Sequence, residues 1–261
     1  MNDGSLEHVA RLRHAPIWIG LTVIVGLSWL YLAHMSANMS GMGSTMAYHA
    51  MKMERAVPLE VLFTFLMWSV MMVAMMAPTA VPAIGLFATL TGRRNPLQHP
   101  AGATAIYVSG YLAVWVGYSV FAALAQWALM RTMLMSPMAG SNSATVSALI
   151  LLSAGAFQLT SLKNACLTQC RSPLAYFMAE WRDGSRGAFY LGLRQGAYCV
   201  VCCWALMAVM FVVGVMNLAW MALLTVFLLA EKVAPPTWHI SRVSGAVLIA
   251  WGVWIGAGIW L

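Results

Sequence analysis

Long apolar stretches separated by short polar segments fill almost the whole chain. We distinguish seven of them along its 261 residues. They cover about 16–33, 59–90, 103–130, 144–162, 190–215, 218–230 and 243–261. A helix needs about 20 consecutive apolar residues to cross the hydrocarbon layer of a bilayer. The pattern therefore predicts an all-α, polytopic transmembrane bundle of about seven helices, in which the sixth is short.

Local signals refine this pattern. The second stretch is too long for one straight crossing, and Pro78 and Pro82 remove backbone donors within it, so we expect the helix to break there. Gly214 and Asn217 predict a tight turn between the fifth and sixth stretches. No small-residue cleavage site follows the first stretch, so we expect it to persist as a helix. The predicted organisation is a cytoplasmic segment over 1–15 and a single transmembrane domain over 16–261.

Composition and charge support a chain surrounded by lipid. The chain is 62% hydrophobic and 8% charged, whereas an ordinary soluble domain has about 25% charged residues. The net charge of +7 does not indicate a nucleic-acid partner, because the basic residues lie in short loops without interleaved aromatics. With the N-terminus in the cytoplasm, eleven basic residues fall inside and three fall outside. The positive-inside rule therefore predicts an inside N-terminus and an outside C-terminus.

The first outside loop, over 34–58, is rich in methionine and histidine. Its candidate ligands include His34, Met42, Met46 and His49. Thioether sulfur is a soft ligand that suits copper(I), and imidazole also accepts copper. Packing does not explain methionines in a loop that faces water. The alternative is that the loop lies on the membrane surface or packs against the helices, where methionine would be ordinary.

A second group of methionines lies within the second apolar stretch. Met67, Met71 and Met75 recur every four residues, and so do Met72 and Met76, so each set shares a helix face. These two stripes are candidate thioether ligands. Packing is the alternative, because methionine commonly fills gaps between helices.

The five cysteines occur in two closely spaced groups. Cys166 and Cys170 follow the fourth stretch, whereas Cys199, Cys202 and Cys203 lie early in the fifth. Both groups fall near the predicted cytoplasmic boundary, where thiols stay reduced rather than forming disulfides. We expect four of them to converge on one site, with Cys202 peripheral. Two or three thiolates suit copper(I), whereas a tetrahedral set of four suits zinc or an iron–sulfur cluster. The alternative is a set of buried, small apolar cysteines.

Polar residues close to the membrane are costly and often mark function. Those that qualify are Glu60, Gln158, Lys163, Glu231 and Lys232. Lys163, three residues before Cys166, would either favour a thiolate there or extend its ammonium group to the interface. Glu231 and Lys232 end the sixth stretch, and anchoring of that helix would explain them.

Four runs in this region, WSVMMVAMMAP, QLTSLKNACLTQCRSP, GAYCVVCCWALM and LLAEK, occur in order. In these runs the chain resembles bacterial domain-of-unknown-function family 2182, whose members are described as predicted metal-binding integral membrane proteins. The resemblance covers about Leu59 to Lys232. The residues that carry it are Met71, Met72, Met75, Met76, Lys163, Cys166, Cys170, Arg171, Cys199, Cys202, Cys203, Trp204, Glu231 and Lys232. It implies a metal site in a bacterial inner membrane protein, without naming the metal or an activity.

Three functional hypotheses remain open. Soft ligands run from the outside loop through the methionine stripes to the inside cysteines, which favours a copper(I)-binding protein for transport or delivery. A metal-dependent membrane oxidoreductase would use the cysteines for metal, with Tyr198 and Trp204 shaping a pocket. An accessory subunit would hand metal to a membrane or periplasmic protein partner. Serine-hydrolase, P-loop and dinucleotide-binding motifs are absent from the sequence.

Overall fold

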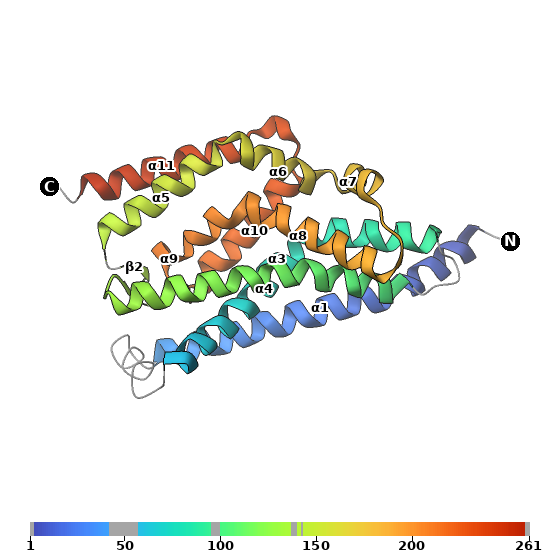
Figure 1. Cartoon of the computed structure of the whole chain (residues 1–261), viewed down its shortest axis with the longest axis horizontal. Coiled ribbons are helices and arrows are strands. Elements are labelled where there is room, and N and C mark those ends of the chain that lie inside the picture. Colours follow the sequence, from blue (N-terminus) through green and yellow to red (C-terminus); the bar gives the residue numbers. More distant parts are fainter. Residues whose placement is uncertain (1–2, 42–56, 95–99, 137–139, 142, 259–261) are drawn as a thin grey trace.

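The computed structural model describes residues 3–41, 57–94, 100–136, 140–141 and 143–258, and helices account for most of them (Figure 1). The helices are α1 (Asp3–Gly41), α3 (Val57–Arg94), α4 (Pro100–Arg131), α5 (Ala144–Gln158), α6 (Ser161–Arg171), α7 (Pro173–Glu180), α8 (Gly184–Ala208), α9 (Met210–Val213), α10 (Leu218–Val233), η1 (Pro236–Trp238) and α11 (Ile240–Ala257). A short antiparallel ribbon pairs β1 (Met135–Ser136) with β2 (Gly140–Ser141). The predicted all-α class is confirmed.

The apolar helices make this a multi-pass membrane protein. Five helical segments are long and apolar enough to cross a membrane: one within α1, then α3, α4, α8 with α9, and α11. The pair α5 and α6, bent by 64° at their junction, qualifies together as a sixth. With 16 residues, α10 is shorter than these spans. Length and composition therefore support five or six crossings, and the expected seventh remains a prediction.

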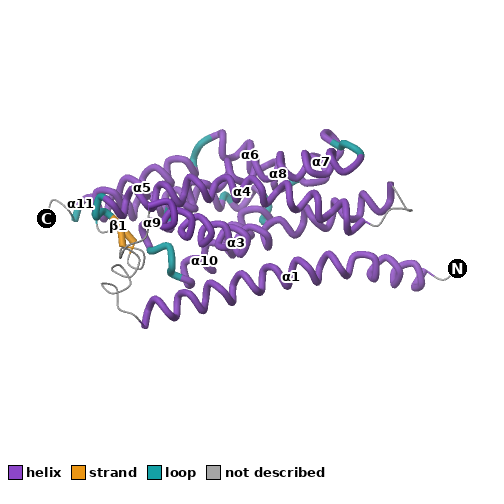
Figure 2. Tube along the Cα trace, turned by 60° about the horizontal axis from the view of Figure 1, so that its bottom comes forward, coloured by secondary structure: helices purple, strands orange, loops and turns teal. Residues whose placement is uncertain are grey.

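The first helix is longer than expected and includes the beginning of the predicted outside loop. It continues to Gly41, so His34 and Met35 lie in a helix and not in a loop over 34–58. Near its end, the Ser36 hydroxyl donates to the backbone carbonyl of Met216, at 3.3 Å. Figure 2 shows α1 along one side of the bundle. The candidate ligands Met42, Met46 and His49 lie outside the described residues.

The predicted break at Pro78 and Pro82 is wrong, because α3 is one helix from Val57 to Arg94. A proline at position 78 deprives the carbonyl of Ala74 of its intrahelical donor. The indole N–H of Trp29, in α1, donates to that carbonyl instead, at 3.1 Å. Neighbouring helices can replace lost backbone hydrogen bonds within a membrane protein, and here α1 does so.

Small residues bring α4 and α8 into close contact. A Cβ atom added at Gly192 would collide with the carbonyl oxygen of Tyr107, and one added at Gly196 would lie 2.8 Å from that of Tyr111. Glycines four residues apart allow helix backbones to approach closely in membranes. This approach places Tyr111 of α4 beside the cysteines of α8.

The helices end at different levels. Gly214, with a φ of 96°, and Asn217, whose side chain accepts from the backbone N–H of Trp220, form the expected turn before α10. Both α6 and α10 end part-way along the bundle, where α3, α4 and α8 continue (Figure 1). Since α8 begins at Gly184 rather than near Tyr190, Cys199 lies about halfway along the apolar span Gly184–Val213, deeper than expected.

Candidate metal centre

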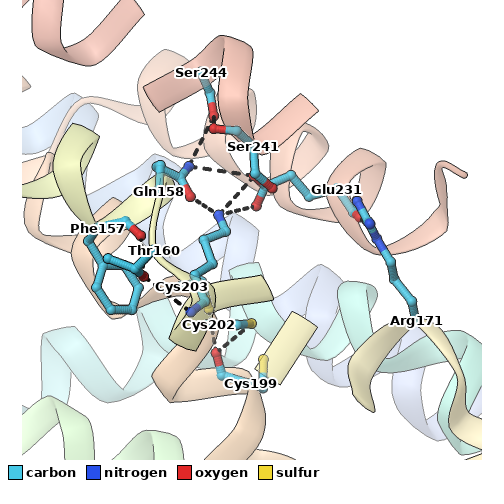
Figure 3. Close-up of polar contacts among 11 residues, drawn as sticks. Phe157, Gln158, Thr160, Arg171, Cys199, Cys202, Cys203, Glu231, Ser241 and Ser244 are labelled. Carbon is cyan, nitrogen blue, oxygen red and sulfur yellow. Dashed lines mark hydrogen bonds and ion pairs between the residues drawn. The ribbon is translucent and has the colours of Figure 1, made fainter. Parts of the chain in front are cut away.

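Three cysteines of α8 form a compact thiol group. The Sγ atoms of Cys199, Cys202 and Cys203 all lie within 4.8 Å of one another, and all three side chains are buried. The thiols of Cys202 and Cys203 donate to the backbone carbonyl of Cys199, at 3.1 and 2.8 Å (Figure 3). All five cysteines of the chain are free. Cys202, which the spacing placed at the periphery, therefore belongs to the closest group.

The cysteines of α6 lie next to this group. Cys170 is half-buried and lines the same cavity as Cys199. Cys166 is also buried but does not line that cavity. The structure thus brings the two cysteine groups of the sequence together, with Cys166 the more remote member. Ligation of a metal by these five thiols remains a prediction.

Three other helices each direct a polar group toward this site. The ammonium group of Lys232, in α10, donates to the Cys199 sulfur at 3.1 Å and to the Thr79 hydroxyl of α3 at 2.6 Å. The Tyr111 hydroxyl of α4 lies 3.1 Å from the same sulfur. Among the described residues no carboxylate pairs with Lys232. An ammonium beside a thiol favours the thiolate, so Cys199 is the sulfur best prepared to carry negative charge.

The anchoring role considered for Lys232 is wrong, since its side chain is buried and directed at Cys199. Its place in the sequence marked it as unusual, but helical spacing alone could not show what it faces. Thr79 and Tyr111 were missed altogether. Hydroxyl groups are common in membrane helices, and only the packing of α3 and α4 on α8 distinguishes these two.

A second polar cluster lies on the other side of α10. The Lys163 ammonium donates to both carboxylate oxygens of Glu231 at 2.8 Å, and both side chains are fully buried. Lys163 also donates to the Gln158 side chain, whose amide donates to the Ser244 hydroxyl at 3.1 Å. Both roles considered for Lys163 are therefore wrong: its ammonium neither reaches the interface nor faces Cys166. It fastens the bend between α5 and α6 onto α10.

Arg171, the last residue of α6, joins these two regions. Its Nε donates to the backbone carbonyl of Glu231 at 2.7 Å (Figure 3). Arg171 also lines a cavity of about 240 Å³ that reaches the cysteine group. The polar residues around this cavity are Thr79, Tyr111, Cys170, Arg171, Gln195, Cys199 and Lys232. Two of them are cations and none is a carboxylate, so the cavity keeps a net positive charge even when Cys199 is a thiolate. Neither Tyr198 nor Trp204 lines it.

The predicted methionine stripes are part of the bundle core. Met71, Met72, Met75 and Met76 are essentially inaccessible to solvent. Met67, which belongs to the first stripe, is buried as well, and other methionines share this core, namely Met135, Met207, Met210, Met216 and Met221. The sequence did not single out the last five, because they come from different elements with no common spacing. Packing accounts for all of them, and metal ligation by the stripes remains a prediction.

His34, the remaining candidate within the described residues, is exposed on α1. One of its ring nitrogens lies 3.0 Å from the side-chain amide of Asn38. It is not a member of the close thiol group of Cys199, Cys202 and Cys203.

One comparison with known proteins bears directly on the site. The model of the family PpoB2, described as copper chaperone, matches residues 65–255. The chain belongs to the PpoB2 family. The matched region contains all five cysteines, Lys232 and both methionine stripes. The family's name differs from that of the family suggested by the sequence motifs, but its description agrees with their metal-related character. No curated protein and no solved structure matches the chain.

Proposed function

We propose that this PpoB2-family protein binds copper(I) within the membrane and delivers it to a partner or across the bilayer. The observation that carries the proposal is the group of three buried sulfur atoms within 4.8 Å of one another. Thiolates are soft ligands that select copper(I), and two or three of them suffice. A structural zinc site usually takes four tetrahedral ligands, and the closest group offers three. The family description, copper chaperone, supports the same metal.

The buried methionines suggest a path for the metal. Tyr111 donates to the carbonyl of Met76, at 3.4 Å, and contacts Cys199, so Met76 lies level with the thiol group. From there the stripes extend toward Met67, about 13 Å farther along α3 at a rise of 1.5 Å per residue. We propose that copper(I) moves between the thiols and this column of weaker, exchangeable thioethers. The outside loop, with Met42, Met46 and His49, would bind copper(I) at the other end of the path.

The proposed arrangement in the membrane has seven crossings. Successive long helices run in alternating directions, and the two termini lie at opposite ends of the bundle (Figure 1). The additional, seventh crossing would be the short helix α10, which extends about 24 Å from the turn at Gly214. The distribution of basic residues supports an N-terminus in the cytoplasm and a C-terminus outside the bacterial inner membrane.

Metal analysis of the purified, detergent-solubilised protein tests this function. We expect the reduced protein to bind copper(I) through sulfur ligands, as X-ray absorption spectroscopy would show, and to prefer it to zinc. Replacing Cys199, Cys202 and Cys203 together by Ser should abolish tight copper binding. Ser147→Ala, which alters a small buried side chain of α5, is the matched control. Copper binding that survives the triple replacement, or tighter binding of zinc, would overturn the proposal.

A further inference from the structure

The charge and size of the cavity beside the thiols indicate what kind of molecule enters it. Its volume of about 240 Å³ accommodates a small ligand and excludes a folded protein. Arg171 and Lys232 line it without any carboxylate. A small ligand with negative charge therefore fits this cavity better than a bare metal cation does.

The thiols around the cavity differ in exposure. Cys170 is partly exposed, whereas Cys199 is only 1% exposed, and both line the cavity. The cavity lies where α6 ends at Arg171 and α10 ends at Val233. A ligand arriving from that end would meet the sulfur of Cys170 before those of the α8 group.

Gln195 supplies an independent sign of a ligand. Its side-chain oxygen is buried and has no hydrogen-bond partner, although the residue lines the cavity. Buried polar atoms normally have a partner. A donor on the occupant, such as a peptide N–H or an ammonium group, would satisfy this oxygen.

We propose that the cavity is the site at which copper(I) is exchanged with a small anionic peptide thiol, and that Cys170 is the first protein sulfur to bind the metal. This inference rests on the proposed function and identifies the carrier that the site recognises. The guanidinium of Arg171 and the ammonium of Lys232 attract the negatively charged carrier, and Gln195 accepts a hydrogen bond from it. A carrier that matches the cavity has one anionic group, one N–H donor and one thiolate.

The exchange proceeds without any change in oxidation state. Copper(I) held by two carrier thiolates has a net charge of minus one. The Cys170 sulfur forms a bond to copper as one carrier sulfur leaves, and the leaving thiolate takes the proton of the Cys170 thiol. The Cys199 thiolate then displaces the second carrier thiolate, with no proton transferred. Copper ends bound by two protein sulfurs, one neutral thiol and one thiolate are released, and the reverse sequence unloads the site.

Loading kinetics with two copper donors test the inference. One donor is copper(I) bound by reduced glutathione, and the other is the cationic copper(I)–acetonitrile complex. The signal is the ultraviolet absorption of copper–thiolate bonds in the anaerobic, purified protein. We expect Arg171→Gln to slow loading from glutathione about tenfold, at the lower end of electrostatic steering effects, and to leave loading from acetonitrile no slower. Arg171→Lys should restore the rate, and Cys170→Ser should also slow loading from glutathione.

Arg182→Gln is the matched control, because Arg182 lies near the same end of the bundle, over the ring of Tyr190, and does not line this cavity. It should load from both donors as the wild type does. The inference is overturned if Arg171→Gln behaves like this control, if it slows both donors equally, or if only a copper-loaded protein can supply the metal. In those cases copper binding itself still stands, whereas a protein that takes copper from no donor refutes the proposed function as well.

Discussion

Glu231 and Lys232 are adjacent in the sequence, yet they serve different parts of the molecule. Glu231 pairs with Lys163 on the α5–α6 bend, and Lys232 donates to Cys199. Adjacent positions on a helix face different directions, so one short run of α10 holds both the bend and the thiol group. At the scale of single residues, each buried charged group has its own partner: Glu231 has Lys163, and Lys232 has Cys199.

The Lys163–Glu231 pair gives a prediction about stability. Lys163→Met leaves the Glu231 carboxylate buried without its cation, which should destabilise the protein by about 3–5 kcal/mol. Chemical denaturation in detergent, followed by circular dichroism, measures the loss. The control is Arg131→Met, which breaks the more exposed pair with Glu60 and should cost about 1 kcal/mol or less. Equal losses in the two variants would mean that the buried pair does not hold α6 in place.

At the scale of elements, the contact between α4 and α8 determines the geometry around Cys199. Gly192→Ala would push the two backbones apart, because the added methyl group meets the carbonyl of Tyr107. We expect a loss of about 1–3 kcal/mol, as for other overpacked contacts, together with weaker copper(I) binding as Tyr111 moves away from Cys199. Thermal melting and copper titration measure the two effects. Gly117→Ala, on α4 with open space around it, should neither destabilise the protein nor weaken copper(I) binding.

The contact between α1 and α3 depends on a hydrogen bond that compensates for a proline. Trp29→Phe removes the N–H that serves the carbonyl of Ala74 and should destabilise the protein by about 1–3 kcal/mol. Trp254→Phe, at an exposed indole of α11, is the control for the loss of an indole at the surface. If both variants melt at the wild-type temperature, the Trp29 bond does not stabilise α3 at its prolines.

For the whole molecule, the proposed arrangement of seven crossings predicts on which side of the membrane each loop lies. Reporter fusions after Ser141 and Leu261 should report an outside location, and a fusion after Asp183 an inside one. The reason is the excess of basic residues in the loops assigned to the cytoplasm. Alkaline phosphatase and green fluorescent protein fusions report the two sides independently. A cytoplasmic signal from the fusion after Leu261 would exclude seven crossings with this orientation.

The sequence by itself determined the helical class and most helix boundaries, because apolar length and turn residues such as Gly214 are local properties. It also identified the two cysteine groups, since the spacing of cysteines along α6 and α8 is a property of the sequence. The sequence misjudged Pro78 and Pro82, because the donor that compensates for one of them belongs to α1. It predicted that Cys170 and Cys199 would converge, but it placed Cys202, a member of the closest thiol group, at the periphery.

The tertiary structure decided which polar groups surround the thiols. Tyr111 and Lys232 contact Cys199 from two helices, and Thr79 of a third contacts Lys232, yet their spacing along the chain contains no sign of these contacts. The same holds for Lys163, whose partner Glu231 is 68 residues away. Local patterns report which face of a helix a residue occupies, but not which helix packs against that face. That choice depends on the close approach of backbones at glycines such as Gly192 and on the pairing of buried charges, and both exist only once the helices have assembled.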